Sequence, residues 1–361
     1  MKRSLIGLLL IGLPVLAQTH RYEVIDLGAL PGQQDSIAFS VNASGTVVGR
    51  SGSRAFTYHD CQMYDLGLLP GGASAAANAI NNQGMIAGLA KGSDAGTHAV
   101  SWYGGTIHLL EPGTVYQSQA LAISGPGKVL GYEYNGAVAY ATAYENDLPV
   151  SVPSDDDPEY GWGAVNLVTG ANGSGQLTGY RSIYNTLNQF IAQLALVIPA
   201  GSSSWVRITP PAGFDQYVTS WAINEDGAVA GWGENGAGVT RAFLSTNPYA
   251  APRNLGTLGG PASQAFGLNN ARWVVGTAST ASAASAFLYD GTQMIDLNTT
   301  LVNGSGWQLT KATAINDYNQ IVGVGIHNGQ SRAFLLTPVT TLIGIVVPCI
   351  PIILREDLAS Q

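Results

Sequence analysis

A ten-residue segment that recurs along the chain limits the fold more than any other feature. In Ala79–Gly88 a short apolar stretch, the polar turn Asn81-Asn82-Gln83-Gly84 and a second apolar stretch end in glycine. The final glycine recurs at spacings of 39, 43, 48, 52, 45 and 47 residues, at Gly49, Gly88, Gly131, Gly179, Gly231, Gly276 and Gly323. A repeat of this length predicts that each copy is one supersecondary unit of a repeat architecture.

Each copy has a polar turn before its final glycine. The turns begin at Asn42, Asn81, Ser124, Asn172, Asn224, Asn269 and Asn316. Asn can close a turn with its side chain, and glycine accepts the left-handed backbone that ends one. Glycine ends the first five turns, whereas Arg272 and Asn319 take that position in the last two. Arg adopts the left-handed conformation less readily than Asn.

Two further signatures follow the turn. The second is a polar residue, alanine and an apolar residue, and it starts at Arg54, His98, Arg241, Ser285 and Arg332. The third is Asp or Asn followed by leucine, and it starts at Asp65, Asn254 and Asp296. Asp290-Gly291, between the second and third signatures of copy six, is a strong hairpin signal. The signatures therefore predict that each unit forms four short strands in about 46 residues, which is the size of a β-propeller blade.

Small residues alternate along the first strand of each unit. With a period of two they share one face, and the innermost strands of a propeller converge on a crowded axis where small side chains fit. We expect the larger residues between them to pack on the opposite face. These larger residues include Phe39, Leu121, Trp221 and Phe266.

The two ends of the repeat region complement each other. Residues 22–28 are an isolated copy of the third signature, and the seventh unit ends at residue 336 without one. We therefore expect an all-β fold, a seven-bladed β-propeller of four-stranded blades whose last blade is completed by residues 22–28. Counting outward from Asp290-Gly291 sets Ser285 opposite Asp296. By analogy this register predicts the cross-strand pairs Arg54–Asp65 and, through closure, Arg332–Asp26, each worth at most ~1 kcal/mol.

The flanking segments indicate export. Residues 1–17 have the charged start, apolar middle and small residue near Ala17 that are typical of a signal peptide, which predicts a secreted or cell-surface protein. The propeller is expected over residues 18–338. The apolar tail, residues 339–361, either anchors the protein, acts as a sorting signal or packs on the domain. We expect membrane contact only through this tail.

Charge and composition exclude several classes of function. The net charge of −8 and the pI of about 5.0 argue against nucleic acid as the main partner. No phosphate-binding loop, nucleophile elbow or Cys/His metal spacing is present, so we expect no cofactor. Cys61 and Cys349 lie far apart in the sequence and either form a single bridge or remain two thiols. We expect a monomer.

A few residues are candidates for a binding site. Tyr132, Tyr180 and Trp232 follow the unit glycine in three successive copies, where they either stack on sugar rings or pack between blades. The insertion after the third copy carries Tyr160 and Trp162 beside an acidic run. That run, Asp155, Asp156 and Asp157, either holds Ca²⁺ or forms a solvated acidic loop.

The repeated phrases resemble the HAF-repeat family of bacterial extracellular proteins. The similarity rests on Leu255–Gly260 and on the recurring Ala-Ile-Asn and Arg/His-Ala-Phe motifs, and it covers about residues 22–337. The resemblance implies secretion but supplies no catalytic residues.

Three functional hypotheses follow. The first is a secreted, non-catalytic propeller that binds a glycan or a protein at the cell surface. The alternatives are a propeller enzyme that hydrolyses or eliminates extracellular polysaccharide, and a structural surface component. Loops that depart from a repeat carry function, which directs attention to the chain between Gly131 and Gly231.

Overall fold

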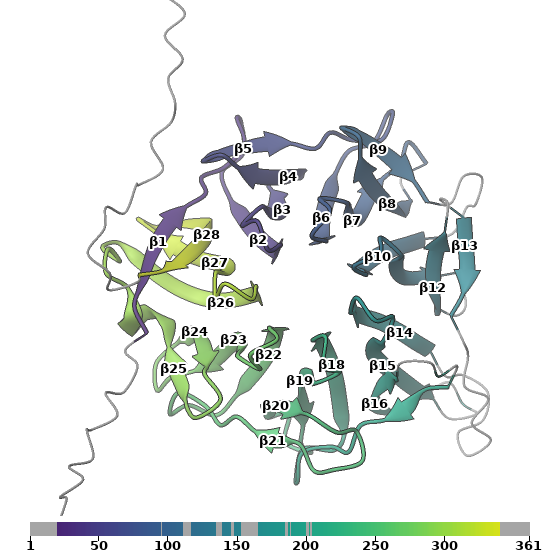
Figure 1. The fold of residues 1–361 in the computed structure, drawn as a ribbon, viewed down its shortest axis with the longest axis vertical. Coiled ribbons are helices and arrows are strands. Elements are labelled where there is room, and N and C mark those ends of the chain that lie inside the picture. The colour runs from purple at the N-terminus through teal and green to yellow at the C-terminus, as the bar shows by residue number, and fades with distance from the viewer. Residues whose placement is uncertain are drawn as a thin grey trace, which may run out of the picture.

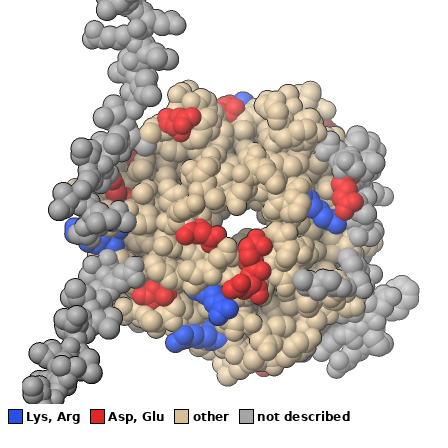
Figure 2. Space-filling model, viewed as in Figure 1, with Lys and Arg blue, Asp and Glu red and all other residues tan. Residues whose placement is uncertain are grey.

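The computed structural model describes residues 20–339 apart from a few short segments, which are 95, 111–116, 135–138, 146–147, 153–164, 185–186, 188, 200–201 and 203. The predicted signal peptide and nearly all of the predicted tail lie outside the described residues, as do Asp155, Asp156, Asp157, Tyr160, Trp162 and Cys349. The described chain is all-β, with 28 strands and one 3₁₀ turn, η1 (Leu297–Thr300). Its sheets are arranged in a ring (Figure 1), and the space-filling view shows an opening at the centre of the ring (Figure 2).

Four sheets each contain one copy of the repeat, with four consecutive strands paired in chain order. Their strands are β2 (Ser36–Val41), β3 (Val47–Ser51), β4 (Arg54–His59) and β5 (Gln62–Asp65); β6 (Ala75–Ile80), β7 (Ile86–Lys91), β8 (Thr97–Tyr103) and β9 (Thr106–Leu109); β10 (Gln117–Ile123), β11 (Val129–Tyr134), β12 (Ala139–Glu145) and β13 (Leu148–Ser151); and β22 (Ser263–Leu268), β23 (Val274–Ser279), β24 (Ala284–Tyr289) and β25 (Met294–Asp296). The predicted four-strand unit is confirmed in these copies.

The fourth and fifth copies share one sheet of eight strands. The first group is β14 (Val165–Ala171), β15 (Leu177–Tyr184), β16 (Phe190–Ile198) and β17 (Val206–Arg207), and the second is β18 (Tyr217–Ile223), β19 (Val229–Glu234), β20 (Thr240–Ser245) and β21 (Arg253–Asn254). A single parallel pair, Gln193 with Tyr217, joins the two groups. Within each group the pairing is antiparallel.

The last sheet contains both ends of the described chain. Its strands β26 (Trp307–Ile315), β27 (Ile321–His327) and β28 (Gln330–Pro338) pair in order, and β1 (Tyr22–Asp26) pairs antiparallel with β28. The other edge of β1 is covered, because Asn303 binds both the N–H and the carbonyl of Val24 at 2.7 and 3.0 Å. The N-terminal strand therefore completes the sheet of the seventh copy, as its orphan signature predicts.

Every inner strand has a β-bulge at the same position. The pairing register shifts by one between the two small residues of each copy, for example between Ala38 and Ser40. A bulge increases the local twist and bends the strand. The seven bulged residues are Phe39, Asn78, Leu121, Thr169, Trp221, Phe266 and Thr313.

The unit glycine is required by the close approach of the first two strands. A Cβ added to Gly49 would lie 2.1 Å from the carbonyl oxygen of Ile37 and 2.9 Å from the ring of Phe56. The glycines at the equivalent place in the other six copies would meet a first-strand carbonyl at 1.8 to 2.0 Å. Phe56 and its counterparts Phe243, Phe287 and Phe334 are fully buried in the core.

The predicted register of the outer hairpin is wrong by two residues. Phe287 lies opposite Asp296, and Phe56 lies opposite Asp65. In copy six Tyr289 pairs with Met294, because Asp290 accepts the N–H groups that follow it and the turn takes four residues. The Arg54–Asp65 ion pair is nevertheless confirmed, because the side chains meet diagonally with Nη2 and Oδ2 2.6 Å apart.

The predicted Arg332–Asp26 pair is wrong. Asp26 binds His327, whose Nδ1 lies 2.6 Å from Asp26 Oδ2, and the imidazole is held in place by stacking on Trp307 at 4.4 Å. The guanidinium of Arg332 instead donates to the Gln34 carbonyl and the Gln330 side chain. In the part of the chain described here, no helix has the length and apolar character of a membrane span.

Candidate functional site

The turns beside the central opening are linked to one another by asparagine side chains. Each Nδ2 donates to a carbonyl in the turn of the next copy, in the bonds Asn42 to Asn81 (3.2 Å), Asn81 to Gly125 (3.3 Å), Asn172 to Asn224 (2.9 Å), Asn224 to Asn269 (3.2 Å), Asn269 to Asn316 (3.3 Å) and Asn316 to Asn42 (2.9 Å). The Oδ1 atom meanwhile accepts N–H groups of its own turn, as Asn42 does from Ser44 and Thr46. This asparagine ladder runs from the last copy back to the first.

Acidic residues of these turns also form hydrogen bonds between neighbouring copies. Figure 2 shows acidic and basic side chains beside the central opening. The Glu225 carboxylate accepts the Gly173 N–H at 2.9 and 3.0 Å, and Asp317 accepts the Asn270 N–H at 2.8 Å. Because they bind neighbouring turns, the carboxylates of Glu225 and Asp317 both have a structural role. Among the described residues, no group of three or more His, Cys, Asp or Glu side chains could hold a metal ion.

Trp232 lies in a cluster of aromatic rings contributed by two neighbouring copies. Its ring centroid is 5.7 Å from that of Trp221 and 5.3 Å from that of Phe266, and Trp221 meets Phe266 edge-on at 5.9 Å. All three side chains are half-buried, so part of each ring is accessible to solvent. We call these three residues the aromatic cluster. It lies on β18, β19 and β22, two of which are inner strands (Figure 1).

A lysine of the seventh copy completes this site. The Lys311 Nζ lies 3.7 Å from the centroid of the Phe266 ring, which is a cation–π contact. Burial lowers the pKa of Lys311 because it disfavours the charged ammonium. Together, the aromatic cluster and Lys311 combine flat apolar surface with a cationic nitrogen donor.

Tyr132 and Tyr180 form a separate group. Burial raises the pKa of both hydroxyls, and the neighbouring Tyr132 and Tyr184 raise that of Tyr180 further. Tyr184 meets Phe190 at 5.6 Å, and Phe190 stacks on Tyr217 at 4.9 Å. Tyr132 and Tyr180 are half-buried, as the three residues of the aromatic cluster are.

The sequence pattern placed only one of the clustered residues among the site candidates. Trp221 and Phe266 are predicted as packing residues, and Lys311 is not singled out. Their common signal is that Trp221 and Phe266 occupy the bulged position of successive copies. The contact between copies that gathers them depends on blade packing, which the repeat spacing does not specify.

Comparison with known proteins defines the fold class. No protein-family model matches the chain, and no curated protein matches its sequence. The solved structure of YCF48 bound to D1 peptide has a TM-score of 0.51 at 13% identity, and the match covers 88% of this chain and 97% of that one. At such low identity this similarity supports the fold alone, which is that of a β-propeller.

Two further solved structures are similar at lower scores. TolB from Acinetobacter baumannii has a TM-score of 0.45 at 11% identity, with 86% of this chain and 65% of that chain covered. A streptogramin B lyase has a TM-score of 0.46 at 10% identity, with 88% of this chain and 98% of that chain covered.

Proposed function

We propose that the chain is a seven-bladed β-propeller, closed by β1, that acts outside the cell as a non-catalytic binding scaffold. Seven four-stranded groups support this count, since the eight-stranded sheet consists of two such groups joined by one residue pair. The asparagine bond from the last copy to the first supports closure. Residues 1–17 and the resemblance to HAF repeats support secretion.

The partner that we propose is a glycan bound at the aromatic cluster. One observation carries this proposal: the half-buried Trp221, Trp232 and Phe266 rings lie together on or beside inner strands. Aromatic rings bury large apolar area with a preferred geometry, and sugar rings stack on such faces. Lys311 adds a donor that suits a sugar hydroxyl or ring oxygen.

A glycan array followed by calorimetry on the full-length protein tests this function. We expect at least one neutral oligosaccharide to bind, and Trp221→Ala and Trp232→Ala to weaken binding about tenfold, or ~1.4 kcal/mol. Tyr64→Ala is the matched control, because Tyr64 stacks on His59 in the outer β4–β5 hairpin. Thermal melting of each variant separates lost binding from lost folding.

Two results would contradict the proposal. One is that no glycan binds the wild-type protein. The other is that a glycan binds equally well to folded Trp221→Ala and Trp232→Ala.

A further inference from the structure

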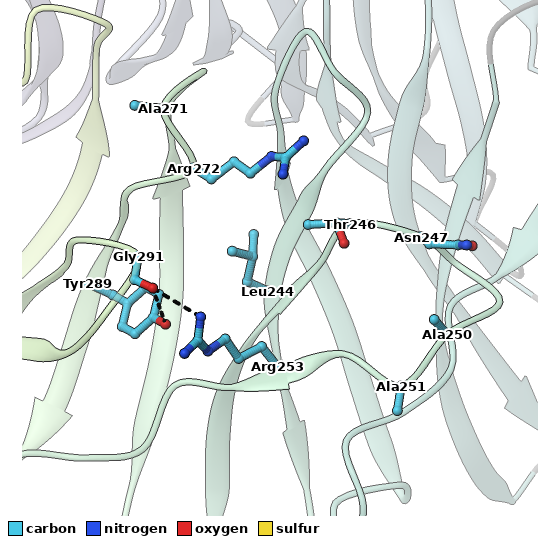
Figure 3. A pocket seen from close by; sticks show the side chains of 10 residues that line it. All are labelled: Leu244, Thr246, Asn247, Ala250, Ala251, Arg253, Ala271, Arg272, Tyr289 and Gly291. Carbon is cyan, nitrogen blue, oxygen red and sulfur yellow. Dashed lines mark hydrogen bonds between the residues drawn. The ribbon is translucent and has the colours of Figure 1, made fainter.

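A cavity of about 400 Å³ lies between the fifth and sixth copies and shares no residue with the aromatic cluster. Its walls are the end of β20, the connection to β21, the turn between β22 and β23, and the end of β24 (Figure 3). The volume falls in the range of small-molecule binding sites. The lining residues, all within the described chain, include two arginines and no acid.

Arg253 is held in a fixed orientation at this cavity. Its Nη1 donates to the Gly291 carbonyl at 3.0 Å, and its guanidinium carbon lies 5.5 Å from the centroid of the Tyr289 ring. Tyr289 donates its hydroxyl to the same carbonyl at 3.0 Å. The hydrogen bond to Gly291 uses only one of the N–H donors of Arg253, so the guanidinium keeps further donors for a ligand.

Arg272 lies on the other side of the cavity. Figure 3 shows the two guanidinium groups on opposite sides of the Leu244 side chain. Arg272 forms an ion pair with Asp226, with Nη2 and Oδ2 3.5 Å apart, and both side chains are at least half exposed. An exposed contact of this length is weak. The second guanidinium is therefore also available to an anion.

The backbone of Arg272 is strained. Its φ is +62°, at the turn position that glycine occupies in the first five copies. Non-glycine residues rarely adopt this conformation, and strained residues concentrate at functional sites. The fold is therefore less stable with arginine at this turn than it would be with glycine. The presence of arginine is consistent with a functional role for the Arg272 side chain.

We propose that this cavity binds the anionic group of an acidic sugar, either a uronate carboxylate or a sugar sulfate. Guanidinium groups suit planar or tetrahedral oxyanions, because each offers several directed N–H donors. Thr246 and Asn247 place a hydroxyl and an amide in the lining, where they match sugar hydroxyls. The choice of a sugar rests on the proposed function, whereas the anion contacts do not depend on it.

Calorimetric titration of the full-length protein with D-glucuronate, a glucose sulfate and glucose tests the inference. We expect saturable binding of at least one anion, weakened by added salt, and no binding of glucose at this cavity. The anion that binds identifies the source of the charge. Arg272→Gly and Arg253→Gln should each weaken binding at least tenfold. Arg272→Gly should also melt at an unchanged or higher temperature, because glycine suits the turn.

Arg50→Gln is the matched control, because it removes one exposed positive charge outside the cavity. Absence of saturable anion binding, or an equal loss of affinity in Arg50→Gln, overturns the inference. Trp221→Ala separates the two proposals. Anion binding that needs Arg272 but not Trp221 supports the cavity even if no glycan binds the aromatic cluster. Neutral glycan binding at Trp221 without anion binding overturns the cavity alone.

Discussion

Asp290 joins a turn to the N-terminal end of the described chain. Its Oδ1 accepts the N–H groups of Thr292 and Gln293 and the Thr292 hydroxyl, and its Oδ2 lies 3.1 Å from Nε2 of His20. Burial alone would raise the pKa of Asp290, but these hydrogen bonds outweigh it and lower the pKa to about 2. The carboxylate therefore stabilises the folded state in its charged form.

The pH dependence of stability should reflect this shift. Because the folded pKa lies below the ordinary value of about 3.9, the contribution is complete above about pH 5 and is lost as the pH falls toward 2. We expect Asp290→Asn to lower the melting temperature by ~2 °C at neutral pH and to melt like the wild type near pH 2. Asp215→Asn, at an exposed site, is the control. A difference that stays constant across this range would refute the assignment.

At the scale of strands and turns, periodicity predicted the elements well and their contacts poorly. The four strands of each copy and the N-terminal strand follow from repeated signatures. The outer hairpin register does not, because Asp290 builds a longer turn than the dipeptide signal implies. The bulges and the need for the unit glycines depend on how closely neighbouring strands approach each other. At each unit glycine an added Cβ would lie about 2 Å from a carbonyl of the first strand, and sequence spacing does not encode this distance.

The bonds between copies in the asparagine ladder could not be predicted from the sequence either. Asn is predicted to cap its own turn, and it does, but its second hydrogen bond reaches a residue one repeat away. Only the assembled molecule brings that carbonyl within reach. The aromatic cluster likewise forms across copies, so the sequence identified Trp232 without its partners.

The ladder has one gap, at the third copy. Ser124 accepts the Lys128 N–H at 3.0 Å within its own turn, but among the described residues no hydrogen bond joins its short side chain to Asn172. Ser124→Asn should supply that bond and stabilise the fold by ~1 kcal/mol, which is about 2 °C in melting temperature. Asn224→Ser is the reciprocal variant, because it removes the 3.2 Å bond to Asn269, and it should destabilise by a similar amount. Changes of the same sign in the two variants would refute this explanation.

At the scale of the whole molecule, the last copy contacts the first through several independent bonds. The Thr313 hydroxyl donates to the Ala38 carbonyl at 2.8 Å, and the Ala333 N–H donates to the Ser36 hydroxyl at 2.9 Å. Together with the pairing of β1 and β28, these bonds join residues about 300 positions apart in sequence. Loop-closure cost rises only slowly with loop length, so the pairing of the N-terminal strand with β28 should contribute to stability despite their separation in sequence.

Tyr22 is the place to test that contribution. Its side chain is 1% exposed in the core of the last sheet, and its hydroxyl has no hydrogen-bond partner among the described residues. Burial raises the pKa of this hydroxyl, which therefore stays protonated. Tyr22→Ala should cost ~3–5 kcal/mol by leaving a cavity. Tyr22→Phe should instead stabilise by ~1 kcal/mol, because it removes a buried polar group without a partner.

Hydrogen exchange should locate the effect of Tyr22→Ala. Because β1 pairs with β28, amides of β26, β27 and β28 should lose protection first, followed by those of β2, which packs against the last sheet. In Tyr22→Phe the same amides should keep or gain protection. Uniform loss across all sheets, or no change in β28, would mean that the N-terminal strand does not hold the two ends together.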